Sequence, residues 1–327
     1  MLRRTFATGG WGGAGRSEFG RSWKKSSAPS NGRGWKDRDA KRSPPKSSEF
    51  KQEKSSVENV LGEPLHGIHG VRQALRCNLR VFHRLMFRDT NGQPAANKDV
   101  KKSDEQNLVK EIKRLASDLA IPITYESKWT LNHVTDDKPH QGVVLFADPI
   151  DIPHFEPHEP PSSDGRPPVI LALDELHDAQ NFGAVLRSAY FLGVHAVLTS
   201  TRNNAPLSAA VLRASVGSSE VLAHERRLFE TPNMHQALAM SQQLGWNIVG
   251  ACSGAKAVSS STYSITKPTI LVVGNEHRGL NSAIRRCCDD ILTIPGAEQD
   301  EASKVDSLNV SVATGILLYQ LLHINIK

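Results

Sequence analysis

Residues 169–198 read VILALDELHDAQNFGAVLRSAYFLGVHAVL, and this stretch sets the architecture of the C-terminal half of the chain. Val169–Leu173 and Val194–Leu198 are short apolar runs typical of buried strands, and Phe182–Leu192 between them has helical spacing. A strand, a helix and a second strand in succession predict parallel strands whose sheet is covered on both faces. Because the turn Asp174–Asn181 contains no glycine, a Rossmann dinucleotide-binding fold is disfavoured.

The same alternation continues towards the C-terminus. Further strands are expected at Trp246–Val249, Thr269–Val273 and Ile291–Ile294, and further helices at Met234–Leu244 and Leu308–Leu322. This half of the chain is therefore predicted to be an α/β domain built on a parallel sheet.

A smaller α/β unit precedes it. Its expected elements are a short helix entered through Leu65–Leu75, a strand at Val81–Phe87, a helix at Asn107–Ala120 and a strand at Gln141–Ala147. The proline-rich stretch Asp151–Pro168 is interpreted as a structureless linker, and not as a metal site of its histidines and glutamates. The predicted boundaries are a leader at 1–55, an N-terminal domain at 56–148, a linker at 149–167 and a C-terminal domain at 168–327.

The distribution of charge and the spacing of the cysteines indicate which partners and sites the chain could have. Residues 1–46 carry a net charge of +9, which leaves −3 for the remainder of a chain whose total is +6. The leader is expected to be disordered and to be either a mitochondrial presequence or a generic basic tail.

The folded part needs a local patch of positive charge if it binds RNA. The candidates for phosphate contacts are Arg72, Arg76, Arg80, Arg84, Arg202 and Arg213. No apolar run is long enough for a transmembrane helix, and the four cysteines have no zinc-site spacing.

Polar residues interrupt the apolar pattern in three segments, each at the end of a predicted strand. The segments are Asp178–Arg187 (DAQNFGAVLR), Gly274–Gly279 (GNEHRG), and a third that begins at Ile294 and closes with Ser307–Val310 (SLNV). The carboxyl ends of parallel strands open on one edge of a sheet, so the three segments are expected to converge on one ligand crevice.

In this order and at these positions the three segments resemble the signature motifs of the SpoU family of RNA ribose 2′-O-methyltransferases. The resemblance implies a SPOUT-type parallel sheet threaded as a trefoil knot, with S-adenosylmethionine as cofactor. Two features depart from the family pattern: Ala179 stands where a proline is usual, and the loop from Gly296 to Asp306 is longer.

The resemblance also implies roles for individual residues. Main-chain groups of Gly274, Ile294 and Leu308 would cradle the cofactor, and the matching polar catalytic positions are Asn181, Arg187, Glu276, Ser307 and Asn309. A guanidinium group is a poor proton acceptor, so Arg187 is expected to hold the target phosphate; the proton could leave to that phosphate, to water or, at high cost, to the arginine. Each residue also has a purely structural interpretation: Asn181, Asn309 and Ser307 as caps, Arg187 as a surface residue, Glu276 as an ion-pair partner.

Gly67–Leu75 and His140–Gly142 resemble the ends of the small substrate-binding domain of ribosomal RNA guanosine methyltransferases in this family. With the basic leader, this implies a mitochondrial matrix enzyme acting on a guanosine in the peptidyl-transferase region of large-subunit rRNA. A homodimer is expected, with no metal and no membrane partner. Two alternatives stay open: a tRNA ribose 2′-O-methyltransferase, and a catalytically inactive RNA-binding assembly factor.

Overall fold

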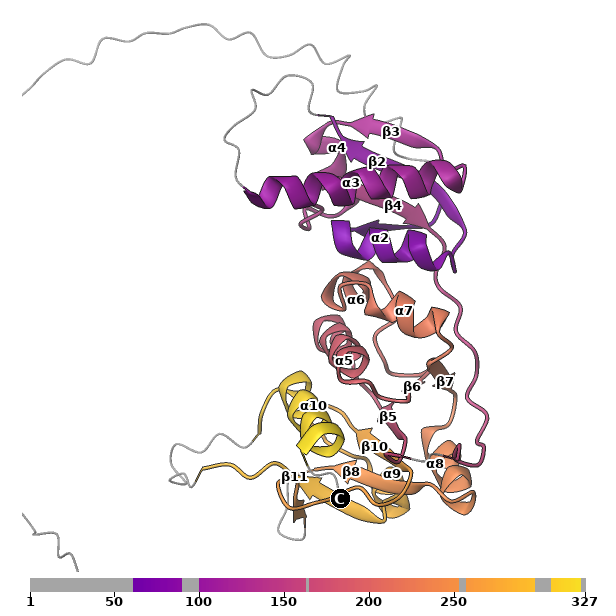
Figure 1. The fold of residues 1–327 in the computed structure, drawn as a ribbon, viewed down its shortest axis with the longest axis vertical. Coiled ribbons are helices and arrows are strands. Elements are labelled where there is room, and N and C mark those ends of the chain that lie inside the picture. Colours follow the sequence, from indigo (N-terminus) through magenta and orange to yellow (C-terminus); the bar gives the residue numbers. More distant parts are fainter. Residues whose placement is uncertain (1–60, 90–99, 163–164, 253–256, 298–306, 325–327) are drawn as a thin grey trace, which may run out of the picture. The chain divides into compact units, whose positions relative to one another are not determined.

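The computed structural model describes residues 61–89, 100–162, 165–252, 257–297 and 307–324 (Figure 1). All of them belong to one compact unit, Ser47–Lys327. The leader expected at 1–55 and most of the long loop expected at 296–306 lie outside the described residues.

The N-terminal part is a four-stranded sheet of order β1-β4-β2-β3 with helices on both faces. Only β2 and β3 run parallel; β1 and β2 are both antiparallel to β4. Alternate β4 residues face opposite sides, so Val143 and Leu145 pack into one cluster with helices α2 and α3, and Val144 and Phe146 pack against α4. The elements are β1 (Glu63–His66), α2 (Ile68–Cys77), β2 (Phe82–Arg88), α3 (Val100–Asp118), β3 (Ile123–Glu126), α4 (Lys128–Val134) and β4 (Val143–Ala147).

The C-terminal part is a seven-stranded sheet of order β7-β6-β5-β10-β8-β11-β9, in which every pairing is parallel. Its strands are β5 (Val169–Leu173), β6 (Ala196–Ser200), β7 (Leu228–Thr231), β8 (Asn247–Ala251), β9 (Val258–Ser259), β10 (Thr269–Val273) and β11 (Asp290–Thr293). Strand β10 lies between β5 and β8 although it follows β8 in the chain. The predicted α/β class with a parallel sheet is confirmed.

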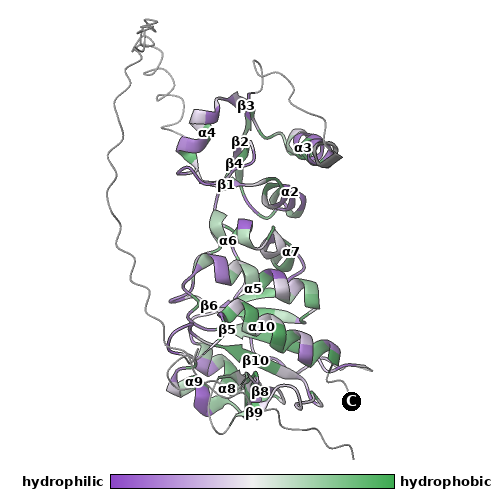
Figure 2. Ribbon diagram, turned by 90° about the vertical axis from the view of Figure 1, so that its left-hand side faces the viewer, coloured by the Kyte–Doolittle hydropathy of each residue, from purple (hydrophilic) through white to green (hydrophobic). Residues whose placement is uncertain are grey.

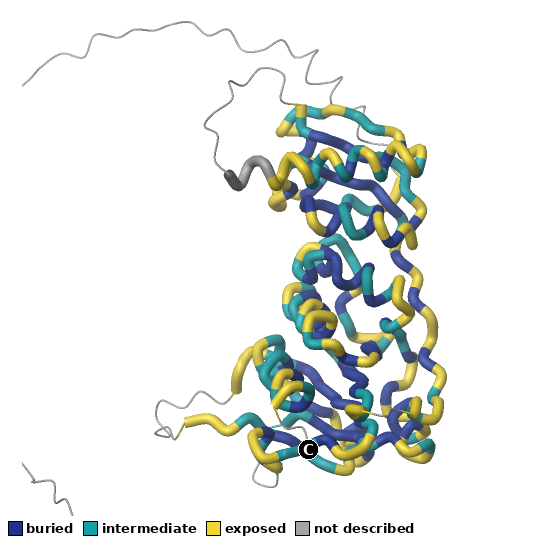
Figure 3. Tube along the Cα trace, viewed as in Figure 1, coloured by how far each residue is buried: buried dark blue, intermediate teal, exposed yellow. Residues whose placement is uncertain are grey.

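Helices cover both faces of this sheet, and its central strands are buried (Figure 3). Residues of α5 and α10 pack in the cluster on one face, and residues of α8 and α9 in the cluster on the other. The helices are α5 (Ala179–Leu192), α6 (Ala209–Ala214), α7 (Ser218–His224), α8 (Met234–Gln243), α9 (Ser282–Cys287) and α10 (Val310–Tyr319), and a π-helical segment (Gln320–Ile324) follows α10.

Described residues in the stretch Asp151–Pro168 bond to the C-terminal part at two points, so the interpretation of these residues as structureless was wrong. The Phe155 amide donates to the carbonyl of Glu230 on β7 at 2.8 Å, and the Phe155 ring is buried in the core. Further along, the indole nitrogen of Trp246 donates to the carbonyl of His158 at 2.8 Å. The described residues here form no helix or strand, yet the backbone and one aromatic ring find partners on the sheet.

Candidate active site at the carboxyl edge of the parallel sheet

Three side chains from the three polar segments form a continuous hydrogen-bonded chain. The Asn181 amide nitrogen donates to Glu276 Oε1 at 3.0 Å, and Asn181 Oδ1 accepts from the Asn309 amide nitrogen at 3.0 Å. The three residues come from α5, the loop after β10 and the start of α10. The convergence expected from parallel strand ends is therefore present.

Asn309 has two roles in this chain. It is the N-cap of α10, where its Oδ1 accepts from the Ser311 amide at 2.9 Å and from the Ser311 hydroxyl at 2.6 Å. The side-chain nitrogen is left to reach Asn181. Ser307, the other candidate cap, is exposed and lies two residues before the cap.

Asn181 is not a cap. The N-cap of α5 is Asp178, whose Oδ1 accepts from the Asn181 amide at 2.7 Å. This bond fixes the first turn of α5 and leaves the whole side-chain amide of Asn181 for Glu276 and Asn309.

Asn275 shapes the loop that carries Glu276. Its buried Oδ1 accepts from the amides of His277 and Arg278 at 2.9 and 3.0 Å, and its backbone pairs with that of Gly279 in both directions. An Asn that folds the backbone around itself in this way favours a single loop conformation.

Gly274 is required by this loop. A Cβ at position 274 would lie 2.5 Å from the Gly279 carbonyl oxygen, which is closer than any packed carbon can approach. Gly274 was expected to let a cofactor approach the backbone closely. The structure shows that the loop itself also requires a glycine at this position, because the loop closes against it.

A buried carboxyl group lies at the end of β5. Burial, the larger cause, and the neighbouring charge of Glu175 together raise the pKa of Asp174 to about 6, against the opposing effect of a hydrogen bond from Asn281 at 3.2 Å. Glu175 itself has a left-handed backbone, φ 58°, and its carbonyl accepts from Asn275 at 3.1 Å. Sequence reasoning missed Asp174 and Asn275, although each directly follows or nearly follows a buried strand.

The other expected site residues form no hydrogen bond to this chain of three side chains. Arg187 lies on α5 about 9 Å beyond Asn181 at the helical rise; it is exposed and bonds to no described residue. Ile294 packs against the core next to the end of β11, and Leu308 is 51% exposed.

The arginines expected to contact phosphate differ in how far their side chains are exposed. Arg202 and Arg213 are exposed, whereas Arg76 pairs with Glu111. Arg80 is buried, with a side chain 1% exposed and bound to Glu63 and Glu220, so its assignment as a phosphate contact was wrong.

Among the described residues no helix is long and apolar enough to cross a membrane, and no group of three metal-binding side chains forms.

Residues 168–319 match the SpoU rRNA Methylase family, and residues 64–153 match the family described as RNA 2′-O ribose methyltransferase substrate binding. A Schizosaccharomyces pombe protein named rRNA methyltransferase 1, mitochondrial, is 32% identical over 293 residues, which is 80% of this chain and 90% of that protein.

Two longer relatives carry the same name. The human protein is 36% identical over 64% of this chain and 62% of its own length, and the Dictyostelium discoideum protein is 31% identical over 67% and 46%. The chain thus spans about half to two thirds of these two relatives.

Solved structures show the same fold. The AdoMet-bound rRNA methyltransferase of Sinorhizobium meliloti superposes with a TM-score of 0.59 at 20% identity, over 83% of this chain and 89% of that one. The SpoU methyltransferase AviRb of Streptomyces viridochromogenes gives 0.57 at 19% identity, over 84% and 96%.

Proposed function

Because the chain belongs to the SpoU rRNA methylase family, we propose that it transfers a methyl group from S-adenosylmethionine to a ribose 2′-hydroxyl of RNA. The observation that supports this most is the chain Asn309–Asn181–Glu276, which unites three segments far apart in sequence at the ligand edge of the sheet.

The described residues fit this cofactor. The Leu308 side chain is an apolar group 51% exposed beside polar side chains, so a bound adenine could cover it. A Cβ at Gly296 would meet no described residue within 4 Å, so none of these residues blocks a ligand from the backbone just after Ile294. We propose that the main chain at Gly274, Ile294 and Leu308 holds the cofactor, which supplies an electrophilic methyl group.

The protein's own groups would position the hydroxyl. Asn181 and Glu276 fix one another, so the reacting ribose would meet a preorganised amide and carboxylate. Arg187 bonds to no described residue, which leaves its guanidinium group for the target phosphate. Its positive charge there would lower the pKa of the neighbouring 2′-hydroxyl. Ser307 is exposed next to Leu308 and completes the proposed catalytic set.

The proposed substrate is a guanosine in the peptidyl-transferase region of mitochondrial large-subunit rRNA, and the proposed location is the mitochondrial matrix. Three relatives named mitochondrial rRNA methyltransferase support the rRNA substrate and the mitochondrial location. The names of these relatives favour rRNA over tRNA, and the assembled polar chain favours an enzyme over an inactive assembly factor.

We also propose a homodimer and a knotted thread. Apolar side chains stay exposed on α5 and α10, including Phe191 (85%), Val312 (50%) and Tyr319 (51%), and Figure 2 shows α10 as a largely hydrophobic helix. A second copy would cover such a surface. The insertion of β10 between β5 and β8 supports the trefoil threading implied by the family.

The function is tested by incubating the purified chain with tritiated S-adenosylmethionine and transcripts of mitochondrial large-subunit rRNA, then mapping 2′-O-methyl groups. We expect one methylated guanosine in the peptidyl-transferase region. Methylation of tRNA alone, or cofactor binding without transfer to any RNA, would contradict the proposal.

A further inference from the structure

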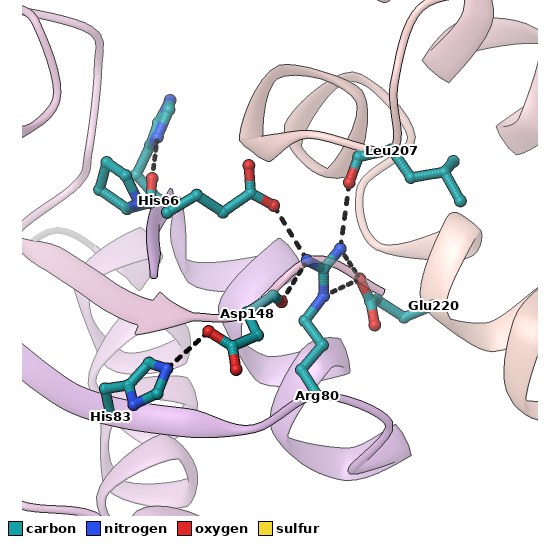
Figure 4. Close-up of polar contacts among 8 residues, drawn as sticks. His66, Arg80, His83, Asp148, Leu207 and Glu220 are labelled. Atoms are coloured by element: carbon teal, nitrogen blue, oxygen red, sulfur yellow. Dashed lines mark hydrogen bonds and ion pairs between the residues drawn. The ribbon is translucent and has the colours of Figure 1, made fainter. Parts of the chain in front are cut away.

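Arg80 joins the N-terminal and C-terminal parts of the chain (Figure 4). Its Nε and Nη2 donate to Glu220 Oε1 at 3.0 and 2.8 Å, and Nη2 also donates to the Leu207 carbonyl at 3.2 Å. Nη1 donates to Glu63 Oε1 at 2.9 Å and to the Asp148 carbonyl at 3.0 Å. One planar group therefore binds two segments of each domain, a geometry that a lysine cannot reproduce.

This ion pair is sealed from water. The side chains of Arg80 and Glu220 are 1% and 0% exposed, and Glu220 Oε2 has no hydrogen-bond partner among the described residues. A buried ion pair contributes little net stability because desolvation offsets its attraction, but loss of one partner leaves an unpaired buried charge. An arrangement of the two domains that separates the partners while either stays buried would therefore be disfavoured.

Close backbone packing surrounds the pair. A Cβ at Gly70 of α2 would lie 3.0 Å from Leu212 Cγ, and a Cβ at Gly217, before α7, would lie 2.6 Å from Gln73 Cβ. Leu212 of α6 is buried in the hydrophobic cluster of the N-terminal domain. The two domains thus share a hydrophobic core at this joint, which is the contact of α2 with α6 and with the start of α7.

The opposite side of α6 contacts the helix that carries the candidate site. A Cβ at Gly183 of α5 would lie 2.5 Å from Ala214 Cβ and 2.8 Å from the Val211 carbonyl. Gly183 lies between Asn181 and Arg187 on α5. The short helix α6 is therefore packed between the N-terminal domain and the catalytic helix.

We propose that Arg80 and Glu220 are positioning residues for RNA. Their buried pair holds the substrate-binding domain against α6 and α7, so that RNA bound to that domain reaches α5 in one orientation. This inference rests on the proposed function, since it assumes RNA as the substrate. The pair touches neither the cofactor edge nor Arg187, so its loss would alter RNA use and spare cofactor binding.

The test compares the full chain with Arg80→Met and Glu220→Gln, using Arg114→Met as the matched control. Arg114 also pairs with a carboxylate, that of Asp118, but within α3 of the N-terminal domain and exposed. We expect both joint variants to raise the KM for the rRNA transcript roughly tenfold or more, with kcat changed less and S-adenosylmethionine affinity within about twofold of wild type. The control is expected to match wild type.

Hydrogen exchange on the same proteins reports on the joint without any reaction. Amides of α2 and α7 should exchange faster in the joint variants, and those of β5 and β10 should not. If Arg80→Met does not fold, Arg80→Lys replaces it, with the same shifts of smaller size. An unchanged KM, or unchanged exchange at α2 and α7, overturns the inference. A wild-type chain that methylates no RNA refutes the proposed function instead, and the exchange data then still report whether the joint is locked.

Discussion

Replacement of Arg187 by alanine separates binding from chemistry. The side chain is exposed and bonds to no described residue, so its loss should change the free energy of unfolding by no more than about 0.5 kcal/mol. If it holds the target phosphate, methylation should fall roughly 10²-fold or more, equivalent to about 2.7 kcal/mol of transition-state stabilisation. The predicted loss of activity is thus about five times the largest predicted loss of stability.

Three measurements on Arg187→Ala check this prediction. Urea unfolding gives the stability, calorimetry gives the S-adenosylmethionine affinity, and transfer of a tritiated methyl group gives the rate. Lys267→Ala is the control, because Lys267 is an exposed cation just before β10, at the opposite edge of the sheet. Arg187→Lys should restore activity only in part, since an ammonium lacks the planar fork. Full activity in Arg187→Ala, or a loss of cofactor affinity equal to the loss of rate, would refute the assigned role.

Four further outcomes are expected. Asn309→Asp keeps the cap of α10 but removes the donor to Asn181, so methylation should fall at least roughly tenfold while stability changes by about 0.5 kcal/mol or less; equal activity would show the bridge to be dispensable. Gly274→Ala should weaken cofactor binding and speed hydrogen exchange at 275–279, because the loop cannot close around a methyl group; normal exchange there would contradict this. Burial holds the pKa of Asp174 at about 6, above its value of 3.8 in the unfolded chain, so the folded state binds the proton more tightly and stability should decrease as pH rises from about 4 to 6. Asp174→Asn should remove that decrease and be more stable at pH 7.5, on the order of 1 kcal/mol by urea unfolding, and a variant less stable than wild type at pH 7.5 would argue against it. Phe191→Asp should convert the proposed dimer to a monomer in light scattering, and a wild-type chain already monomeric at micromolar concentration would exclude the dimer.

Periodicity located the long or strongly apolar elements. Strands β5 and β10 begin and end at the predicted residues because both are five-residue apolar runs buried on both faces. Helices α6 and α7, of six and seven residues, were missed because two turns are too short to show a hydrophobic period.

The sequence did not predict which side chains from distant segments contact one another. Order and position of the motifs were enough to group Asn181, Glu276 and Asn309, but not to show that Asn181 bonds to both others. Arg80 was misjudged because a single arginine looks the same whether it faces RNA or a glutamate 140 residues away.

The pairing of the linker with β7 also bears on solubility. Strand β7 is the last strand at its end of the sheet, and an open edge presents backbone groups on which another chain can add a strand and aggregate. The linker occupies that edge through a parallel bridge between His154 and Glu230, and the ring of Phe155 anchors it. At the other end β9 has only two residues, too few to template a partner strand. The segment that ties the two domains together thus also hinders the addition of a foreign strand at one end of the parallel sheet.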